Sequence, residues 1–89
     1  MNFGKALEEL KIGNKVSREG WNGKGMFIFV QGGSVISSKN ARNDVLREMN
    51  SEAIRIHNHI DMKAVDGSIT IGWNPSQADM FAEDWNIVK

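Results

Sequence analysis

The chain has no cysteine, no tyrosine and only one proline among its 89 residues. The lack of cysteine excludes disulfide bonds and thiolate metal sites. No apolar run approaches the roughly 20 residues that a membrane-spanning helix needs, and the first residues lack the pattern of a signal peptide. We therefore expect a cytoplasmic protein that does not associate with a membrane.

Neither sign of charge is in excess, because eleven basic side chains balance eleven acidic ones. Binding to a nucleic-acid polymer requires the neutralisation of many phosphates, so this balance argues against such a partner. The distribution is uneven, however: residues 1–25 carry five basic and three acidic side chains, and residues 66–89 carry one basic and four acidic. A small anionic ligand needs only a local positive site, which the first third of the chain could supply.

Local patterns at both ends of the chain predict regular structure. Apolar residues at helical spacing predict an N-terminal helix of about nine residues, which begins after Asn2 and ends before Gly13. Val16 is expected on a short strand. Residues 26–30 form an apolar run with little alternation, which is typical of a central strand. Residues 84–88 are expected to form the last strand.

The clearest hairpin is predicted in residues 60–71, where apolar and polar residues alternate on both sides of Asp66-Gly67. We predict a two-residue turn at this dipeptide. A short helix over residues 77–82 is expected to begin at Pro75 or Ser76. The whole chain, residues 1–89, is thus predicted to be one α+β domain: a small antiparallel sheet of four or five strands, with an N-terminal helix and a short C-terminal helix packed on it.

The segment from Val35 to Asn58 gives the weakest pattern. A helix from about Asn40 to Met49 would be capped by Ser37 or Ser38, and its apolar face would consist of Val45, Leu46 and Met49. The polar composition fits equally well an excursion from the sheet that is only partly ordered.

The run from Arg18 to Phe29 contains the strongest functional signal. Asn22-Gly23 indicates a turn, and the three glycines of this run leave backbone N–H groups unshielded, so that they could cradle an anion. Arg18, Trp21 and Lys24 add a fork of donors, an aromatic face and a point charge, a combination that suits a nucleotide. The alternative is a turn between strands in which the tryptophan closes the core.

Three tryptophans in so short a chain are informative. Trp85, followed by apolar residues, is expected in the core. Trp21 and Trp73 stand beside glycine and asparagine, which places them at the mouths of loops. There they could stack on a ligand ring or anchor a subunit interface, and the sequence leaves both interpretations open.

Two groups of residues could support other chemistry. His57, His59 and Asp61 would share one face of a strand and could bind a metal, although histidines that form hydrogen bonds or contact a ligand are the alternative. Asp79 and Glu83 would be neighbours on a helix and could act as acid and base, although a solvated helix face is the commoner arrangement. We expect no metal and no cofactor.

Three stretches of the chain resemble a known family: VSREGWNGKGM at 16–26, HIDMK at 59–63 with the following Asp66-Gly67, and the run from Trp73 to Trp85. They resemble the phage family of Thoeris anti-defence proteins of the second type. This resemblance implies a sponge without catalytic activity, which sequesters the cyclic ADP-ribose-type signal (glycocyclic ADP-ribose) of the bacterial Thoeris system. It also implies a homotetramer that has ligand pockets at subunit contacts and is located in the host bacterial cytoplasm. Some members of the family hold cyclic oligonucleotides as well.

The resemblance implies a ligand site from the first and last of these stretches, made by Arg18, Trp21, Asn22, Gly23, Trp73, Gln77 and Asp79. Ala78 stands where many relatives have a hydroxyl residue, and residues 31–58 match poorly, so the choice of ligand stays open.

Two other functions remain as alternatives. One is a protein-binding inhibitor of a host defence component, anchored by exposed tryptophans. The other is an enzyme that cleaves a nucleotide, using Asp79 or Glu83 with His57 or His59.

Overall fold

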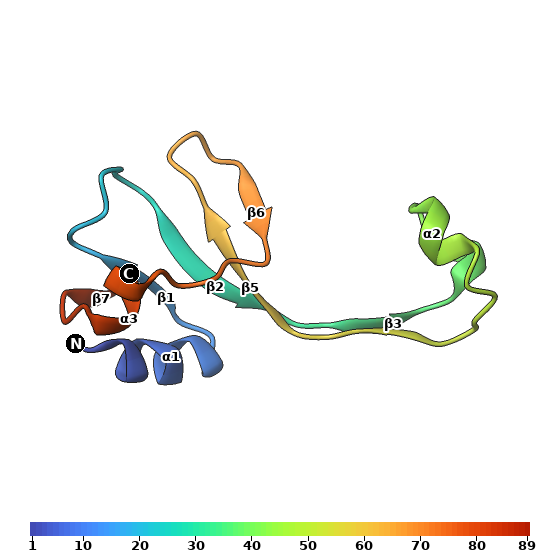
Figure 1. Cartoon of the computed structure of the whole chain (residues 1–89), viewed down its shortest axis with the longest axis horizontal. Helices are drawn as coiled ribbons and strands as arrows, with labels where there is room; N and C mark the ends of the chain where they lie inside the picture. Colours follow the sequence, from blue (N-terminus) through green and yellow to red (C-terminus); the bar gives the residue numbers. More distant parts are fainter.

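The computed structural model describes all 89 residues and contains a five-stranded antiparallel sheet, a separate two-stranded sheet and short helices (Figure 1). The strand order in the larger sheet is β6-β5-β2-β1-β7. This arrangement confirms the predicted α+β class, and none of the helices is long and apolar enough to cross a membrane. In chain order the elements are α1 (Phe3–Lys11), β1 (Lys15–Arg18), β2 (Phe27–Gln31), β3 (Ser34–Ile36), the 3-10 helix η1 (Ser38–Asn40), α2 (Asp44–Arg47), β4 (Ile54–Ile56), β5 (His59–Lys63), β6 (Ile69–Ile71), α3 (Gln77–Phe81) and β7 (Trp85–Val88).

The helix α1 forms where the sequence predicts it, because both ends carry strong local signals. The side chain of Asn2 accepts a hydrogen bond of 2.9 Å from the backbone N–H of Lys5, and Gly13 takes a φ of 96° just past the end. Its apolar face packs on β1, β2 and β7, and it also contacts α3. The core that results is small and consists of Ala6, Leu10, Val16, Ile28 and Trp85.

The hairpin of β5 and β6 is confirmed, but the predicted two-residue turn is wrong. The backbone N–H of Ala64 donates to the carbonyl of Ser68 at 2.9 Å, which leaves Val65, Asp66 and Gly67 as a three-residue loop. Gly67 has a φ of 89°. A three-residue hairpin loop needs a left-handed residue at its last position, and glycine supplies this conformation without steric cost.

Residues 32–58 leave the sheet as an arm, with β3 and β4 as its stem and with η1 and α2 at its tip (Figure 1). The predicted helix from Asn40 to Met49 is therefore wrong. Only a four-residue helix forms, capped by Asn43 instead of a serine, and its neighbour Met49 remains exposed. Only the short η1 makes substantial contact with this helix, and so short a helix is marginal alone. The alternative interpretation, an excursion from the sheet, matches its path.

The arm gives the chain an extended shape. Its longest dimension is 45 Å against 26 and 25 Å for the others, and its radius of gyration is 15.8 Å, whereas about 12 Å is typical of a compact chain of this length. The accessible surface of 6360 Å² exceeds by roughly 1,100 Å² the area expected for this mass. The single chain therefore exposes more surface than a globular monomer of its size.

Candidate functional site

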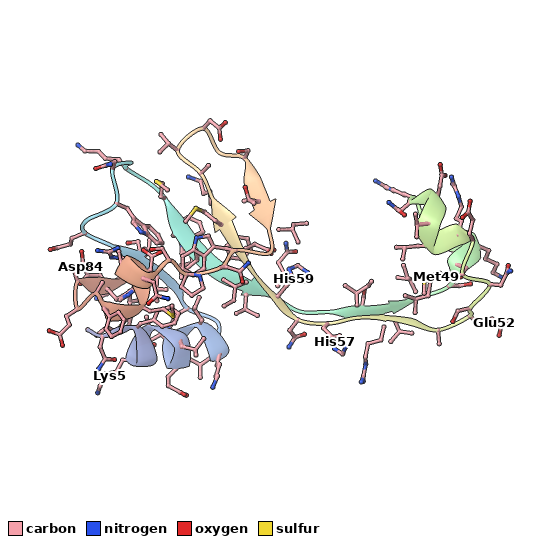
Figure 2. All side chains as sticks on the ribbon, in the orientation of Figure 1. Lys5, Met49, Glu52, His57, His59 and Asp84 are labelled. Carbon is pink, nitrogen blue, oxygen red and sulfur yellow. The ribbon has the colours of Figure 1, made fainter.

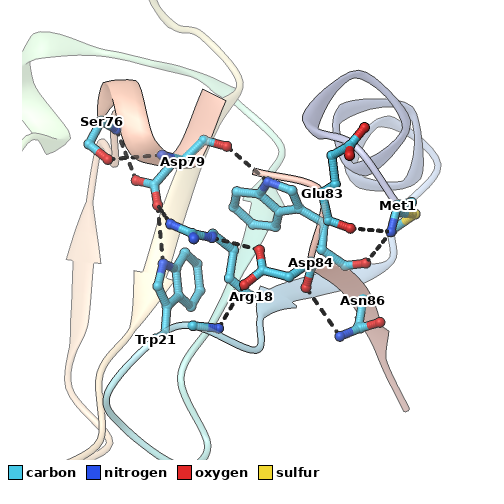
Figure 3. Close-up of polar contacts among 10 residues, drawn as sticks. Met1, Arg18, Trp21, Ser76, Asp79, Glu83, Asp84 and Asn86 are labelled. Atoms are coloured by element: carbon cyan, nitrogen blue, oxygen red, sulfur yellow. Dashed lines mark hydrogen bonds and ion pairs between the residues drawn. The ribbon is translucent and has the colours of Figure 1, made fainter. Parts of the chain in front are cut away.

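Four of the predicted ligand-binding residues lie together at one end of the sheet, and Figure 3 shows the polar contacts of three of them. The four are Arg18, Trp21, Trp73 and Asp79. They come from the end of β1, the loop after it, the segment after β6 and the helix α3. The fold thus brings together the two sequence stretches that were expected to form one site.

Arg18 is the centre of this cluster. It lies opposite Trp85 in the pairing of β1 with β7, which directs it toward the C-terminal segment. Its Nη1 donates to Asp79 Oδ1 at 2.8 Å, and its Nε donates to Asp84 Oδ1 at 2.9 Å. The backbone N–H of Gly20 donates to the other oxygen of Asp84 at 2.8 Å. One N–H group of the predicted anion cradle, that of Gly20, is therefore already bound to a carboxylate of the chain itself.

Asp79 is held from several sides. It lies in the first turn of α3, where its backbone N–H donates to Ser76 Oγ at 3.1 Å and its Oδ2 accepts from the backbone N–H of Ser76 at 2.9 Å. Its Oδ1 also accepts from Trp21 Nε1 at 3.2 Å (Figure 3). This reciprocal capping explains why so short a helix forms. Asp79 is only 8% exposed, so the solvated helix face considered as an alternative is wrong for this residue.

These contacts fix the charges of both carboxyl groups. Burial alone would raise the pKa of Asp79. The hydrogen bonds from Ser76, Arg18 and Trp21 lower it by more, so the net pKa lies below its usual value. The hydrogen bond from Arg18 likewise lowers the pKa of Asp84. Both groups are ionised at neutral pH. The predicted helical pair of Asp79 with Glu83 is wrong, because α3 ends at Phe81.

The three tryptophans form one aromatic cluster. Trp85 is completely buried, as predicted, and its Nε1 donates to the carbonyl of Asp79 at 3.0 Å. Trp21 lies edge-on to Trp85, with ring centroids 5.3 Å apart, and Trp73 lies 6.1 Å from Trp21. Trp21 and Trp73 are half-buried. Each of the two residues therefore keeps some exposed surface, which a ligand could contact.

The remaining predicted residues lie at the edge of this cluster. The side chains of Asn22 and Gln77 are exposed, which leaves their amide groups accessible to a ligand. Gly23 is closely approached by two side chains: a Cβ there would lie 2.2 Å from Val65 Cγ2 and 2.7 Å from Met26 Sδ, so these side chains would have to shift. The turn predicted at Asn22-Gly23 is displaced: it lies at Lys24-Gly25, where Gly25 has a φ of 80°, and neither Asn22 nor Gly23 has a positive φ.

A second polar cluster surrounds Asp61, which lies in the middle of β5 beside the segment that leads to Trp73. Asp61 is fully buried, with His59 Nδ1 2.6 Å from its Oδ1, and it accepts hydrogen bonds from Gln31 Nε2 and from the backbone N–H of Gly72. Burial raises the pKa of Asp61, but these hydrogen bonds hold it below its usual value. His57 lies outside β5, so the predicted face of three metal ligands is wrong, and no group of three His, Cys, Asp or Glu side chains is placed to hold a metal ion.

Sequence reasoning missed Asp84 as the second partner of Arg18. The two residues are 66 positions apart, and no local pattern links them. The available signal was their position: Asp84 directly precedes the last strand, and Arg18 ends the first one. If these two strands pair antiparallel, their ends meet.

Comparison with known proteins gives the family. The model of the Tad2-like family, described as the Thoeris anti-defense 2-like domain, matches residues 1–88. Thoeris anti-defense 2 of Bacillus phage SP01 is 43% identical over 89 residues, which is the whole of this chain and 96% of the relative. The match includes residues 31–58, where the motif resemblance was poor. The chain therefore belongs to the Thoeris anti-defense 2-like family.

Proposed function

We propose that this protein is a phage anti-defence sponge, which binds and holds the cyclic ADP-ribose-type signal (glycocyclic ADP-ribose) of the Thoeris system without degrading it. Family membership and the name of the relative support an anti-defence role against Thoeris in the cytoplasm of the host. The observation that supports nucleotide binding is the half-buried pair of Trp21 and Trp73, fixed in place by Trp85 and Asp79.

The magnitudes are consistent with a sponge. Holding a signal at nanomolar concentration requires about −12 kcal/mol. Stacking on two tryptophans contributes about 2–6 kcal/mol, and each hydrogen bond to a charged phosphate contributes about 1.5–3 kcal/mol. The rings are already packed against Trp85, so their ordering costs little at the moment of binding.

The state of the carboxylates favours binding over catalysis. Asp79 and Asp84 are both engaged by Arg18, and their lowered pKa values keep them ionised. A general acid must carry a proton near neutral pH, so neither residue suits that role. An ionised carboxylate can still act as a base, but both groups are already bound by Arg18, and this engagement supports a binder that returns its ligand unchanged.

We also propose that the functional unit is a homotetramer with its ligand pockets at subunit contacts. The excess surface of roughly 1,100 Å² is comparable with the approximately 800 Å² that each partner buries in a standard interface. Val45 and Met49 at the tip of the arm are more than half exposed, which gives a partner apolar surface to cover. Sedimentation at micromolar concentration is expected to give a mass near four chains, and a monomer would contradict the proposal.

One incubation tests the sponge directly. The purified protein is mixed with cyclised ADP-ribose, free ligand is measured by mass spectrometry, and the sample is then heated to unfold the protein and measured again. We expect the free ligand to disappear and to return intact, and the Trp21→Ala/Trp73→Ala variant to leave most of it free. Cleaved ligand, with a heated buffer control intact, would instead indicate an enzyme.

A third result would favour a protein-binding inhibitor of a host defence component. In that case the ligand would stay free throughout, and the protein would form a stable complex with a Thoeris protein in the absence of nucleotide.

A further inference from the structure

The stem of the arm contains a groove that the tryptophan cluster does not include. Its volume is about 540 Å³, and it is lined by Gly33, Ser34, Val35, Arg55, Ile56, His57 and Asn58. Figure 2 shows His57 on this stem, between the sheet and the helical tip. We propose that the groove binds phosphate groups, with Arg55 and His57 as the donors.

The shape of the groove depends on Gly33. A Cβ at this position would lie 1.9 Å from the carbonyl oxygen of Ile56 and 2.9 Å from the carbonyl carbon of His57, so no side chain fits between the two strands. The backbone N–H of Gly33 donates to Asn58 Oδ1 at 2.7 Å, which ties the two sides of the stem together. The stem therefore offers bare backbone beside the two donor side chains.

The charge of the groove is not compensated. Arg55 and His57 are two residues apart on an extended segment, so they share one side of it, and both are exposed. Arg55 faces Val35 across the stem, no acidic residue lines the groove, and the ion pairs of the structure involve neither donor. A free guanidinium pairs with phosphate through two parallel hydrogen bonds, and an imidazole N–H adds a third donor.

The tryptophan cluster has the opposite balance. There Arg18 contributes one positive charge and is paired with two carboxylates, Asp79 and Asp84. A ligand that stacks on the rings would thus find Arg18 already paired, and the loop after it offers the phosphates only the exposed Lys24. Among these two sites, the groove is the one with an arginine whose donors are unoccupied.

The groove residue His57 lies close in the chain to a residue that contacts the tryptophan cluster. The backbone N–H groups of Gly72 and Trp73 both donate to the carbonyl of Ile60, at 3.1 and 2.7 Å. His57 precedes Ile60 by three residues, which is about 10 Å of extended chain. The bound phosphates could belong to the nucleotide that stacks on Trp73 or to a separate phosphate-bearing ligand, and the chemistry of recognition is the same.

Calorimetric titration of the full-length protein tests this proposal, with inorganic pyrophosphate and cyclised ADP-ribose as probes. We expect Arg55→Gln to weaken pyrophosphate binding about tenfold or more, as the loss of a charge-assisted hydrogen bond predicts, and His57→Gln to weaken it less. Arg42→Gln is the matched control, because Arg42 is also exposed on the arm but lies outside the groove. All variants change exposed side chains, so folding should be preserved.

The second probe identifies the source of the phosphates. If one nucleotide spans both sites, Arg55→Gln also weakens the binding of cyclised ADP-ribose, and pyrophosphate competes with cyclised ADP-ribose for the protein. If a separate ligand uses the groove, only pyrophosphate binding falls. Because the pyrophosphate titration does not require the sponge, failure of the two proposals can be told apart. The groove assignment is overturned if neither probe depends on Arg55, or if Arg42→Gln has the same effect.

Discussion

Replacement of Trp21 by alanine should affect stability and ligand binding by amounts that can be estimated separately. Truncation of a fully buried tryptophan costs about 3–5 kcal/mol, so a half-buried one should cost about 2 kcal/mol. Loss of the hydrogen bond to Asp79 adds about 1 kcal/mol, since Arg18 and Ser76 still hold that carboxylate. The total loss of about 3 kcal/mol is a large part of the free energy of unfolding, which is roughly 4–13 kcal/mol for a chain of this length.

Ligand binding should weaken by about 1–3 kcal/mol, which is about 5- to 150-fold in the dissociation constant, because one stacking surface is lost. Urea unfolding at fixed protein concentration measures the first effect, and calorimetry with cyclised ADP-ribose well below the unfolding midpoint measures the second. Trp21→Phe is the matched control: it keeps a ring against Trp85 but removes the donor to Asp79, so it should lose about 1 kcal/mol of stability and retain most of the binding.

The pair of variants makes the reasoning refutable at both steps. If folded Trp21→Ala binds the ligand as tightly as the unmodified chain, then Trp21 belongs to the core alone. If Trp21→Phe binds as weakly as Trp21→Ala, the indole N–H and its contact with Asp79 determine affinity, and stacking does not. A stability loss below about 0.5 kcal/mol in the alanine variant would contradict the packing seen in the aromatic cluster.

Three further predictions concern the framework of the site. Arg18→Leu should lower the melting temperature much more than Arg47→Leu, because Arg18 joins two distant carboxylates, whereas Arg47 forms only an exposed pair within one helical turn; equal shifts would contradict this. Since the folded pKa of Asp79 lies below its unfolded value of about 3.9, its contribution to the free energy of unfolding is complete above about pH 5 and is lost as the pH falls through the folded pKa. Thermal unfolding should therefore show little change from this group between about pH 5 and 7 and a decline below about pH 4, which is weaker in Asp79→Asn. Gly23→Ala should destabilise by about 1–3 kcal/mol through overpacking, whereas Gly32→Ala, where a Cβ meets nothing within 4 Å, should be nearly neutral in the same urea assay.

The parts of the fold that could be predicted have signals confined to a few neighbouring residues. Asn2 and Gly13 mark the ends of α1, and alternation marks β5 and β6. The arm has no comparable signal: β3 and β4 have three residues each, and the register that pairs Ser34 with Ile56 is set by partners far apart in the sequence. A helix was predicted there from spacing alone, and tertiary packing did not support it.

The candidate site likewise has some features that local sequence signals predict and others that depend on residues far apart in the chain. The residue types around Trp21 indicated a ligand site, but the sequence could not show that Arg18 is already paired with two carboxylates, because those contacts span 61 and 66 positions. Arg55, a donor of the proposed phosphate site, was not predicted from the sequence, since the groove it lines depends on the space left by Gly33 across the stem. Long-range pairing and close backbone approach are the two features that composition and spacing did not reveal.

The separation of the arm from the sheet has a consequence for how the protein can evolve. The arm forms its own two-stranded sheet and stands away from the small core (Figure 1). Substitutions, insertions or deletions at its tip therefore leave the packing around Trp85 unchanged, and their effect falls on the proposed subunit contacts of Val45 and Met49. Assembly of the subunits and folding of the core can thus be changed separately, because they depend on different parts of the chain.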